Sequence, residues 1–470
     1  MSGLYASLNA SVQSLSAQSR ALEIAGKNLA NVNNASYARQ RVVFGDLGTV
    51  QTPTGPESMG LQAMSIQQLR DSLLDQQVMR ESSLSADYTA QQSAYQRAQA
   101  GLGQSVSGTD ATSGSSSTTD NGIGAALDDV FNAFQGLAAS PTDVGQRQTL
   151  LQKTAILTDR LQSADQSLAQ VQTDLNTQIG SDVTSVNQLL QNVADLNAQI
   201  GRFEVNSPGS AVDLRDQRQA VLEQLATKLP ITATEGASGQ VQVSAKDASG
   251  NPVVLVSLAA VTGPVAFNGT QITAGATPTA LALNAGSIQG ALTARDGAVQ
   301  TLRDNLDQLA AQLVTSVNAA YNPTGTTGDF FTAGGTTAAT IQVDPSVTAA
   351  NLKASDGGAA GDNTVATAIA QLASQKFSTA GGDQINGTFS SFYANSVSAL
   401  GQALSTANSQ ASNQSSIEQL VRTQRDGVSG VSLDEELADL QKYQRAFQAS
   451  SRVFTTIDNL LDVVVNQLGR

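Results

Sequence analysis

Residues 430–465 read GVSLDEELADLQKYQRAFQASSRVFTTIDNLLDVVV, and the spacing of their apolar residues decides the fold. An apolar residue recurs every seven positions, which keeps one apolar seam of a helix facing a partner helix. At about 1.5 Å per residue, a helix over 433–468 extends roughly 50 Å. The members of this C-terminal seam are Leu433, Leu440, Phe447, Phe454, Leu461 and Leu468.

The start of this helix is marked by the run S-L-D-E. Ser432 and Glu435 have the spacing of a capping box, in which each side chain binds a free backbone N–H of the first turn. The acidic residues Asp434, Glu435 and Glu436 allow two interpretations, a metal cluster or a complement to the helix dipole. The dipole interpretation is favoured, because three carboxylates in a first helical turn are common without a metal.

The N-terminal stretch has the same seven-residue spacing, and it predicts a second long helix. Residues 1–45 carry more basic than acidic side chains, whereas the C-terminal seam begins with acidic ones. We therefore expect the two ends to pair with each other or with the ends of neighbouring copies. The members of the N-terminal seam are Leu8, Leu15, Leu22 and Leu29.

The patterns between the two seams predict a mainly α fold with a small β insertion. Helical spacing covers 65–103, 123–229, 287–321, 362–376 and 388–428, whereas 231–288 alternates like short strands, with a hairpin turn at Asn268–Gly269. We expect a discontinuous, layered architecture of a terminal coiled-coil layer, an inner helical bundle and an outer β domain. The predicted parts are 1–45 with 430–470 (terminal coiled coil), 46–230 with 287–322 and 362–429 (helical rod), 231–286 (outer β domain) and 323–361 (a Gly/Thr-rich loop or β excursion).

Three local patterns inside this frame give further expectations. The run at 103–122 is rich in Gly, Ser, Thr and Asp and predicts an exposed loop. Ser140 before Pro141 predicts a helix start. The charged residues of the run DLRDQR predict a solvated helix face with surface ion pairs; they are Asp213, Arg215, Asp216 and Arg218.

Composition removes most catalytic chemistry. The chain of 470 residues has no Cys and no His, which excludes thiol nucleophiles, His-based triads and His–Cys zinc sites. Its net charge of −14 argues against nucleic-acid binding. No run reaches the ~20 apolar residues of a membrane span, and the first residues lack the pattern of a cleaved signal peptide. We expect no enzyme, no cofactor, no metal and no membrane insertion.

Residues 28–40 read NLANVNNASYARQ, and this run resembles the signature of flagellar rod, hook and hook-associated proteins, N-I-A-N-V-N-T-P-G-Y-S-R-Q. The chain departs from that signature at Leu29, Asn34, Ala35, Ser36 and Ala38, so the Pro–Gly turn is missing. The ending Y-x-R-Q is closer to the hook-associated protein 1 family than to hook or rod proteins. The matching residues are Asn28, Ala30, Asn31, Val32, Asn33, Tyr37, Arg39 and Gln40.

Other parts of the chain carry the same resemblance. The end at 430–465 is similar to that family's G-V-N-L-D-E-E ending, and 131–148, 213–225 and 286–310 also resemble it. The resemblance implies a structural subunit that joins hook to filament and is exported to the cell exterior through the flagellar type III apparatus. It also implies that the terminal helices pack with other copies, with hook protein and with the next junction protein. A flagellar export chaperone would bind the C-terminal helix over 433–468.

Alternatives remain open from the sequence. A hook or distal-rod protein shares the class but fits the Y-x-R-Q and LDEE runs less well. A non-flagellar adhesin or an enzyme-bearing surface protein would need a ligand pocket. For Asn28, Asn31 and Asn33 the choice is between helix C-capping and a hydrogen-bond site between subunits; capping is favoured for Asn33 and Asn34.

Overall fold

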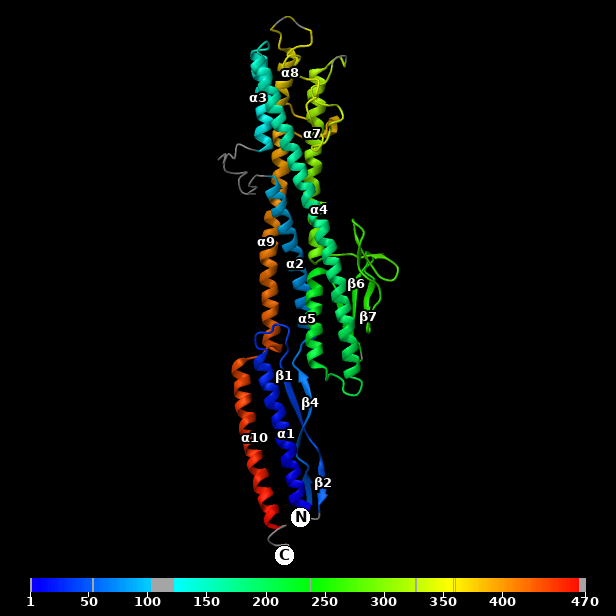
Figure 1. The fold of residues 1–470 in the computed structure, drawn as a ribbon, viewed down its shortest axis with the longest axis vertical. Helices are drawn as coiled ribbons and strands as arrows, with labels where there is room; N and C mark the ends of the chain where they lie inside the picture. Colours follow the sequence, from blue (N-terminus) through cyan, green and yellow to red (C-terminus); the bar gives the residue numbers. More distant parts are fainter. Residues whose placement is uncertain are drawn as a thin grey trace. The chain divides into compact units, whose positions relative to one another are not determined.

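The computed structural model describes residues 2–52, 55–102, 122–236, 238–325, 328–357, 359 and 361–464. Most of the loop expected at 103–122, and Leu468 of the C-terminal seam, lie outside these ranges. The fold is mainly helical with a small β part, as predicted (Figure 1). The chain forms two compact units, the first made of Met1–Ser85, Val183–Gly286 and Gln414–Arg470 and the second of Ala86–Asp182 and Ser287–Asn413. The four-part division expected from the sequence stays a prediction.

The two ends of the chain pair with each other in the first unit. Helix α1 (Ser2–Ala30) and helix α10 (Leu433–Asp462) lie side by side (Figure 1). Strand β1 (Gln40–Asp46) and strand β4 (Leu61–Gln68) pack against α1 and pair antiparallel with each other, and β2 (Thr49–Thr52) pairs with β3 (Gly55–Ser58) in the segment between them. The expectation of helix from residue 65 was therefore wrong, because helix α2 begins only at Ser72.

A small apolar core joins α1, the β1–β4 ribbon and α10. Ile24 of α1 and Val42 of β1 are buried, and Tyr443 of α10 packs against them. The rings of Phe44 and Tyr443 lie 6.3 Å apart in a tilted arrangement. Gly60 has a positive φ of +98°, and a Cβ at this position would lie 2.9 Å from the Cα of Ala10, so only glycine fits where the ribbon crosses α1.

The rest of the first unit combines helices with the predicted β insertion. It holds the start of α2 (Ser72–Gly101), the end of α4 (Val144–Phe203), all of α5 (Val212–Lys228) and the end of α9 (Phe389–Ser429). The insertion forms an antiparallel sheet in the order β5-β6-β7-β8 and a smaller one in the order β11-β10-β9. Their strands are β5 (Thr232–Glu235), β6 (Val241–Lys246), β7 (Pro252–Ser257), β8 (Ala260–Val261), β9 (Ala266–Phe267), β10 (Ile272–Ala274) and β11 (Thr279–Ala280).

The hairpin expected at Asn268–Gly269 is confirmed. Strands β9 and β10 pair antiparallel on either side of this turn, with Phe267 opposite Ile272. The Asn268 Oδ1 accepts hydrogen bonds from the backbone N–H groups of Thr270 and Gln271, and Gly269 has a φ of +92°. An Asn side chain that folds back on its own turn followed by a glycine is the physical basis of the Asn–Gly signal.

The second unit is built around aromatic side chains. It holds the remaining parts of α2, α4 and α9, together with α3 (Ile123–Ala139), α6 (Ser287–Ala294), α7 (Gln300–Tyr321) and α8 (Thr364–Gln371). Short 3-10 turns cover Leu372–Ser374 and Thr379–Gly381. The ring of Phe330 packs on three neighbours at centroid distances of 5.0–5.5 Å; these are Phe134, Tyr321 and Phe331. A chain with only 4% aromatic residues thus places four of them together in this core.

Three local expectations need correction. Ser140 does not start a helix; it is the C-cap of α3, and α4 begins at Val144. The helix expected over 287–321 is interrupted by a π-helical turn at Arg295–Val299, where Gly297 leaves helical geometry. Among the described residues of 323–361, the β content is a single bridge between Phe331 and Val343.

Candidate functional site

The side chain of Asn28 joins the two ends of the chain. Asn28 lies in the last turn of α1 and is 1% exposed. Its Nδ2 donates to the Gln40 backbone O at 2.7 Å and to Glu436 Oε2 at 3.0 Å. Its Oδ1 accepts from the Gln40 backbone N at 3.0 Å and from the Tyr37 hydroxyl at 2.8 Å. One amide therefore closes the loop after α1 and also holds α10.

Arg39 forms the second connection between the ends. Its Nε donates to Glu436 Oε1 at 2.6 Å, and its Nη1 pairs with Glu435. Its backbone N–H donates to the Ser429 carbonyl at 2.8 Å, just before α10. Glu436 is buried and takes hydrogen bonds from both Asn28 and Arg39, so its charge is neutralised inside the protein. We call Asn28, Tyr37, Arg39, Gln40, Glu435 and Glu436 the terminal clasp.

The expected capping box at the start of α10 was wrong. Ser432 does occupy the N-cap position with extended backbone angles, but its side chain makes no cap hydrogen bond. Glu435 does not reach back to it, because Arg39 binds its carboxylate. Among the described residues no group of three or more acidic side chains is arranged to hold a metal ion. Instead, the guanidinium of Arg39 pairs with Glu435 and Glu436 in the acidic first turn of α10.

Asn31, rather than Asn33, caps the C-terminus of α1. The Asn31 Nδ2 donates to the Lys27 carbonyl at 3.0 Å, and Ala30 beside it is exposed. Asn34 makes a local turn, in which its Oδ1 accepts from the Ser36 backbone N at 3.3 Å. Asn33 is exposed, and its side chain has no hydrogen bond to a described residue. The capping interpretation therefore fits Asn31, and Asn28 binds within its own chain.

A shell of buried ion pairs supports the loop between α1 and β1. Arg70 donates to the Ser36 carbonyl at 3.0 Å and to Asp75 Oδ2 at 2.9 Å, and it also pairs with Asp216. Arg425 of α9 donates to the Ala35 carbonyl and to Glu223, each at 2.7 Å. The loop lacks the Pro–Gly turn of the flagellar signature. The guanidinium groups of Arg70 and Arg425 instead bind its backbone carbonyls.

The run DLRDQR is not a solvated helix face, contrary to expectation. Asp216 and Arg218 are buried, and Asp216 Oδ1 also accepts from the Ala38 backbone N. Arg215 binds both oxygens of Glu204 at 2.8 Å. Asp213 pairs with Lys27 and accepts from Gln40 Nε2 at 3.0 Å. The start of α5 is therefore part of the support for the terminal clasp.

Burial changes the acidity of several groups in this region. Burial raises the pKa of the Asp216 carboxyl to about 6, although the ion pair with Arg70 opposes the shift. Arg70 also pairs with Asp75, and burial raises the pKa of that carboxyl as well. One guanidinium cannot fully offset the cost of burying the negative charges of two carboxylates. Burial, together with the charge of Asp216, raises the pKa of the Tyr37 hydroxyl. Tyr37 therefore stays protonated as a hydrogen-bond donor to Asn28.

The N-terminal seam lies beside the most buried line of α1. Leu8, Leu15, Leu22 and Leu29 are each partly buried. Apart from Ile24 and Asn28, the buried side chains of this helix are small; they are Ala17, Ala21, Ala25 and Ser11. The leucine spacing predicted the position of the helix, but alanines make up most of its buried apolar side chains.

The C-terminal seam is only partly covered in a single chain. Leu461 is buried, and Leu440 and Phe454 are half-buried against the rest of the first unit. Leu433 and Phe447 remain 47% and 38% exposed. Further large apolar side chains of α10 and of its C-cap are exposed beside the seam; they are Leu437, Val453, Leu460 and the C-cap Val463.

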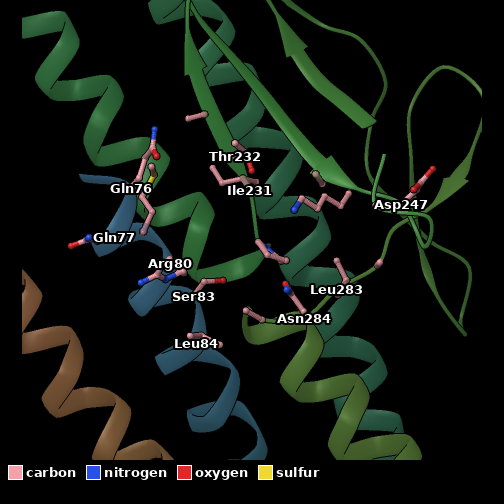
Figure 2. Close-up of a pocket in the computed structure, with 18 of the residues that line it drawn as sticks. Gln76, Gln77, Arg80, Ser83, Leu84, Ile231, Thr232, Asp247, Leu283 and Asn284 are labelled. Carbon is pink, nitrogen blue, oxygen red and sulfur yellow. The ribbon is translucent and has the colours of Figure 1, made fainter. Parts of the chain in front are cut away.

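Figure 2 shows a pocket of about 660 Å³ between α2 and the connections to the β insertion. Ser83 of α2 is buried at its wall, and its Oγ has no hydrogen-bond partner among the described residues. Asp247 is the carboxylate that lines it, and its Oδ1 accepts from the backbone N–H groups of Ser249 and Asn251 in its own turn. The pocket thus presents one carboxylate, rather than the pair that glycosidases use.

No described helix combines the length and the hydropathy that crossing a membrane would require.

Two protein-family models match parts of this chain. Residues 110–331 match the family model "Flagellar hook-associated protein FlgK helical domain", and residues 426–468 match "Flagellar basal body rod FlgEFG protein C-terminal". The second match covers the end of α9 and helix α10. Neither of these two matches includes the clasp residues at 28–40.

Proteins called flagellar hook-associated protein 1 are similar over the full length. The protein of Bacillus subtilis strain 168 is 27% identical, with 100% of this chain and 99% of that protein covered. Those of Salmonella typhimurium and Escherichia coli K12 are 24% identical, each with 98% of this chain and 99% of the relative covered. A solved structure, "the flagellar hook junction protein FlgK from Burkholderia pseudomallei", matches 55% of this chain and 46% of its own, with 21% identity and a TM-score of 0.46.

These full-length similarities and the paired terminal helices define a structural protein of the bacterial flagellum. Within that class, the chain belongs to the flagellar hook-associated protein 1 family.

Replacing Asn28 by alanine is expected to destabilise the first unit by on the order of 3 kcal/mol, because it leaves several buried polar groups without partners. Asn28→Asp keeps the shape but places a carboxylate beside Glu436, so its cost should shrink at low pH. Urea unfolding measures both. The control is Asn33→Ala, an exposed site where a change within about 0.5 kcal/mol is expected. Equal stability of all three variants would contradict the clasp.

Stability should also depend on pH through Asp216. Its folded pKa of about 6 exceeds the ordinary 3.8, so between these values the folded chain holds a proton that the unfolded chain releases. The stability of the wild type relative to Asp216→Asn should therefore fall as the pH rises from about 4 to about 6, by up to about 3 kcal/mol. Asp434→Asn, at an exposed site, is the control. A pH-independent difference would refute this assignment.

Proposed function

We propose that this chain is a structural subunit of the junction between hook and filament, and that it acts by assembly rather than by catalysis. One observation carries the proposal. Helices α1 and α10 pack on each other, yet they carry seven of the twenty large hydrophobic side chains that are exposed in the described residues. Soluble monomers rarely keep such apolar surface uncovered, so it marks a contact with other chains.

The partners follow from this surface and from the family. Neighbouring copies, hook protein and the next junction protein cover α1 and α10. Burying one large apolar side chain contributes roughly 1.5–3 kcal/mol, and several per subunit make addition favourable. The subunit acts outside the cell, after type III export. The four sequence-predicted parts, 1–45 with 430–470, the helical rod, the outer β domain 231–286 and the loop 323–361, are proposed as its radial layers.

The seam over 433–468 is also proposed as the site of an export chaperone. Leu440, Phe454 and Leu461 face the rest of the first unit in the folded chain. Before export α1 would not yet cover them, and an amphipathic helix offers such a line of apolar side chains to a groove. Chaperone binding and α1–α10 pairing would then exclude each other.

Substitutions on α10 should separate folding from assembly. Leu440→Asp and Phe454→Asp place a charge in the α1–α10 contact, and they should abolish incorporation while the β insertion stays folded. Leu437→Asp and Leu460→Asp change side chains that are 41% and 51% exposed, so the isolated subunit should keep its stability but still fail to incorporate. Phe203→Asp, at a 68% exposed site at the end of α4 rather than on a terminal helix, is the matched control and should incorporate normally.

Immunogold electron microscopy of detached flagella, with an antibody against residues 231–288, shows whether each variant is incorporated. The wild type should give one tight band where hook meets filament. Label along the whole hook would favour a hook protein instead, and label away from flagella would contradict the proposal. Normal incorporation of Leu440→Asp or Leu437→Asp would show that α10 does not drive assembly.

A further inference from the structure

The last part of α9, Gln414–Ser429, turns polar side chains toward the rest of the first unit. Gln414 is buried, and its Nε2 donates to the Glu81 carboxylate at 2.6 Å. Arg425 is also buried and pairs with Glu223. No large apolar side chain of this segment is buried. Hydrogen bonds and ion pairs, rather than apolar packing, therefore hold this part of the helix in place.

The large apolar side chains of the same segment lie on its outside. Ile417, Leu420 and Val428 are between 45% and 61% exposed. Together with Gln424 they follow the spacing i, i+3, i+7 and i+11, so these four residues form one line along the helix, which we call the α9 stripe. A helix of a soluble protein normally buries its apolar face and exposes its polar face. The reversed arrangement indicates a surface that another chain covers.

Charge restricts what can cover the α9 stripe. The exposed residues from Ser415 to Gln424 are all uncharged. Each copy of the chain has a net charge of −14, so two copies repel each other unless the surfaces that meet are free of acidic groups. The α9 stripe meets this condition for one of the two surfaces. The other surface has to be apolar, exposed and uncharged as well.

Helix α1 carries such a surface. Its residues from Ser2 to Ser19 include no charged side chain. Tyr5 and Val12 are exposed, and with Asn9 and Ser16 they form a second line, at the spacing i, i+4, i+7 and i+11, which we call the α1 stripe. In the described residues, the other exposed large apolar side chains without a charged residue within two positions lie singly on different elements; they are Met64, Ile156 and Leu258.

The two stripes also agree in direction and length. Helix α1 and the last part of α9 run in opposite directions (Figure 1). Copies that repeat head to tail along one axis share one orientation, so α1 of a second copy would also run antiparallel to α9. Both stripes extend over about 11 residues, or roughly 16 Å. Antiparallel alignment then places Tyr5 beside Val428 and Asn9 beside Gln424, and Val12 comes next to Leu420.

We infer that the α1 stripe of one copy docks on the α9 stripe of a second copy. The inference rests on the proposed function in requiring that copies assemble with one orientation. The contact is heterologous, because each copy uses two different surfaces and can bind one neighbour through each of them. Such a contact builds rings or open helices rather than closed pairs. It also explains why α9 exposes its apolar side chains exactly where its other side is fully engaged in polar contacts.

A disulfide between positions 9 and 424 tests this contact, because the chain has no cysteine of its own. The two positions cannot meet within one chain. The end of α1 lies near the end of α9, where Arg425 binds the Ala35 carbonyl, and Asn9 lies about 19 residues, or roughly 28 Å, back along α1 from Asn28. A disulfide between them therefore joins two copies.

Chains with both Asn9→Cys and Gln424→Cys should give disulfide-linked dimers and larger multiples when detached flagella are oxidised. The matched control is Asn9→Cys with Gln419→Cys, since Gln419 is exposed on the same helix but lies away from the α9 stripe. This control and each single-cysteine variant should give no linked product. Immunogold labelling confirms that each variant is incorporated.

Charged substitutions in the α9 stripe supply a second arm. Ile417→Asp with Leu420→Asp, added to the 9–424 cysteine pair, should lower the yield of linked dimers at least tenfold, because the charges enter an apolar contact. Neither side chain is buried in the isolated subunit, so its urea unfolding should stay unchanged. Gln419→Asp in the same background is the control and should cross-link like the parent.

Two results would overturn the inference. One is the absence of any 9–424 product in flagella with a normal junction band, which would leave the proposed function intact. The other is a photo-crosslinker attached to Gln424→Cys that joins only a different flagellar protein, which would show that another partner covers the α9 stripe. A lost junction band in flagella built from wild-type chain would instead contradict the proposed function itself.

Discussion

The structure of the two chain ends depends on one buried amide, that of Asn28. An amide offers two donors and one oxygen with two acceptor positions, and all of them are used: for both backbone groups of Gln40, for the Tyr37 hydroxyl and for Glu436. Because a buried polar group without a partner is costly, no other side chain of this size fits the site equally well. The need to satisfy this amide brings together residues 408 positions apart in the sequence.

The terminal clasp explains why an apolar seam alone does not specify this fold. Apolar stripes allow α1 to pair with any suitable helix, including those of other copies, because burial is not directional. The hydrogen bonds among Asn28, Arg39 and Glu436 select the chain's own α10 and fix where it begins. The remaining apolar surface of α10 is then left for other chains. Specific polar contacts within the subunit thus determine how the two ends fold, and apolar contacts between subunits drive assembly.

The sequence predicted the terminal helices and the β insertion, because periodic leucines and the Asn–Gly turn are local signals, and it gave the pairing of the two ends within one chain as one of two alternatives. It could not predict the partners of Asn28, since no local pattern links residues 28 and 436. It placed the N-cap of α10 correctly at Ser432 but predicted capping-box hydrogen bonds that do not form, because the long-range Arg39 binds Glu435. It missed strands β1–β4, whose alternation at Val42 and Phe44 is short, and it treated Asp216 as solvated although Arg70 lies behind it. In each case a tertiary ion pair or hydrogen bond prevailed over a local preference.

Native-state amide hydrogen exchange of the purified subunit tests most directly whether the clasp makes α1 and α10 one cooperative element. The account predicts that the two helices exchange with the same opening free energy, together with β1 and β4, because neither helix can detach without breaking the buried contacts of Asn28 and Glu436. Fast exchange throughout α10, while α1 and the β1–β4 ribbon stay protected, would contradict it.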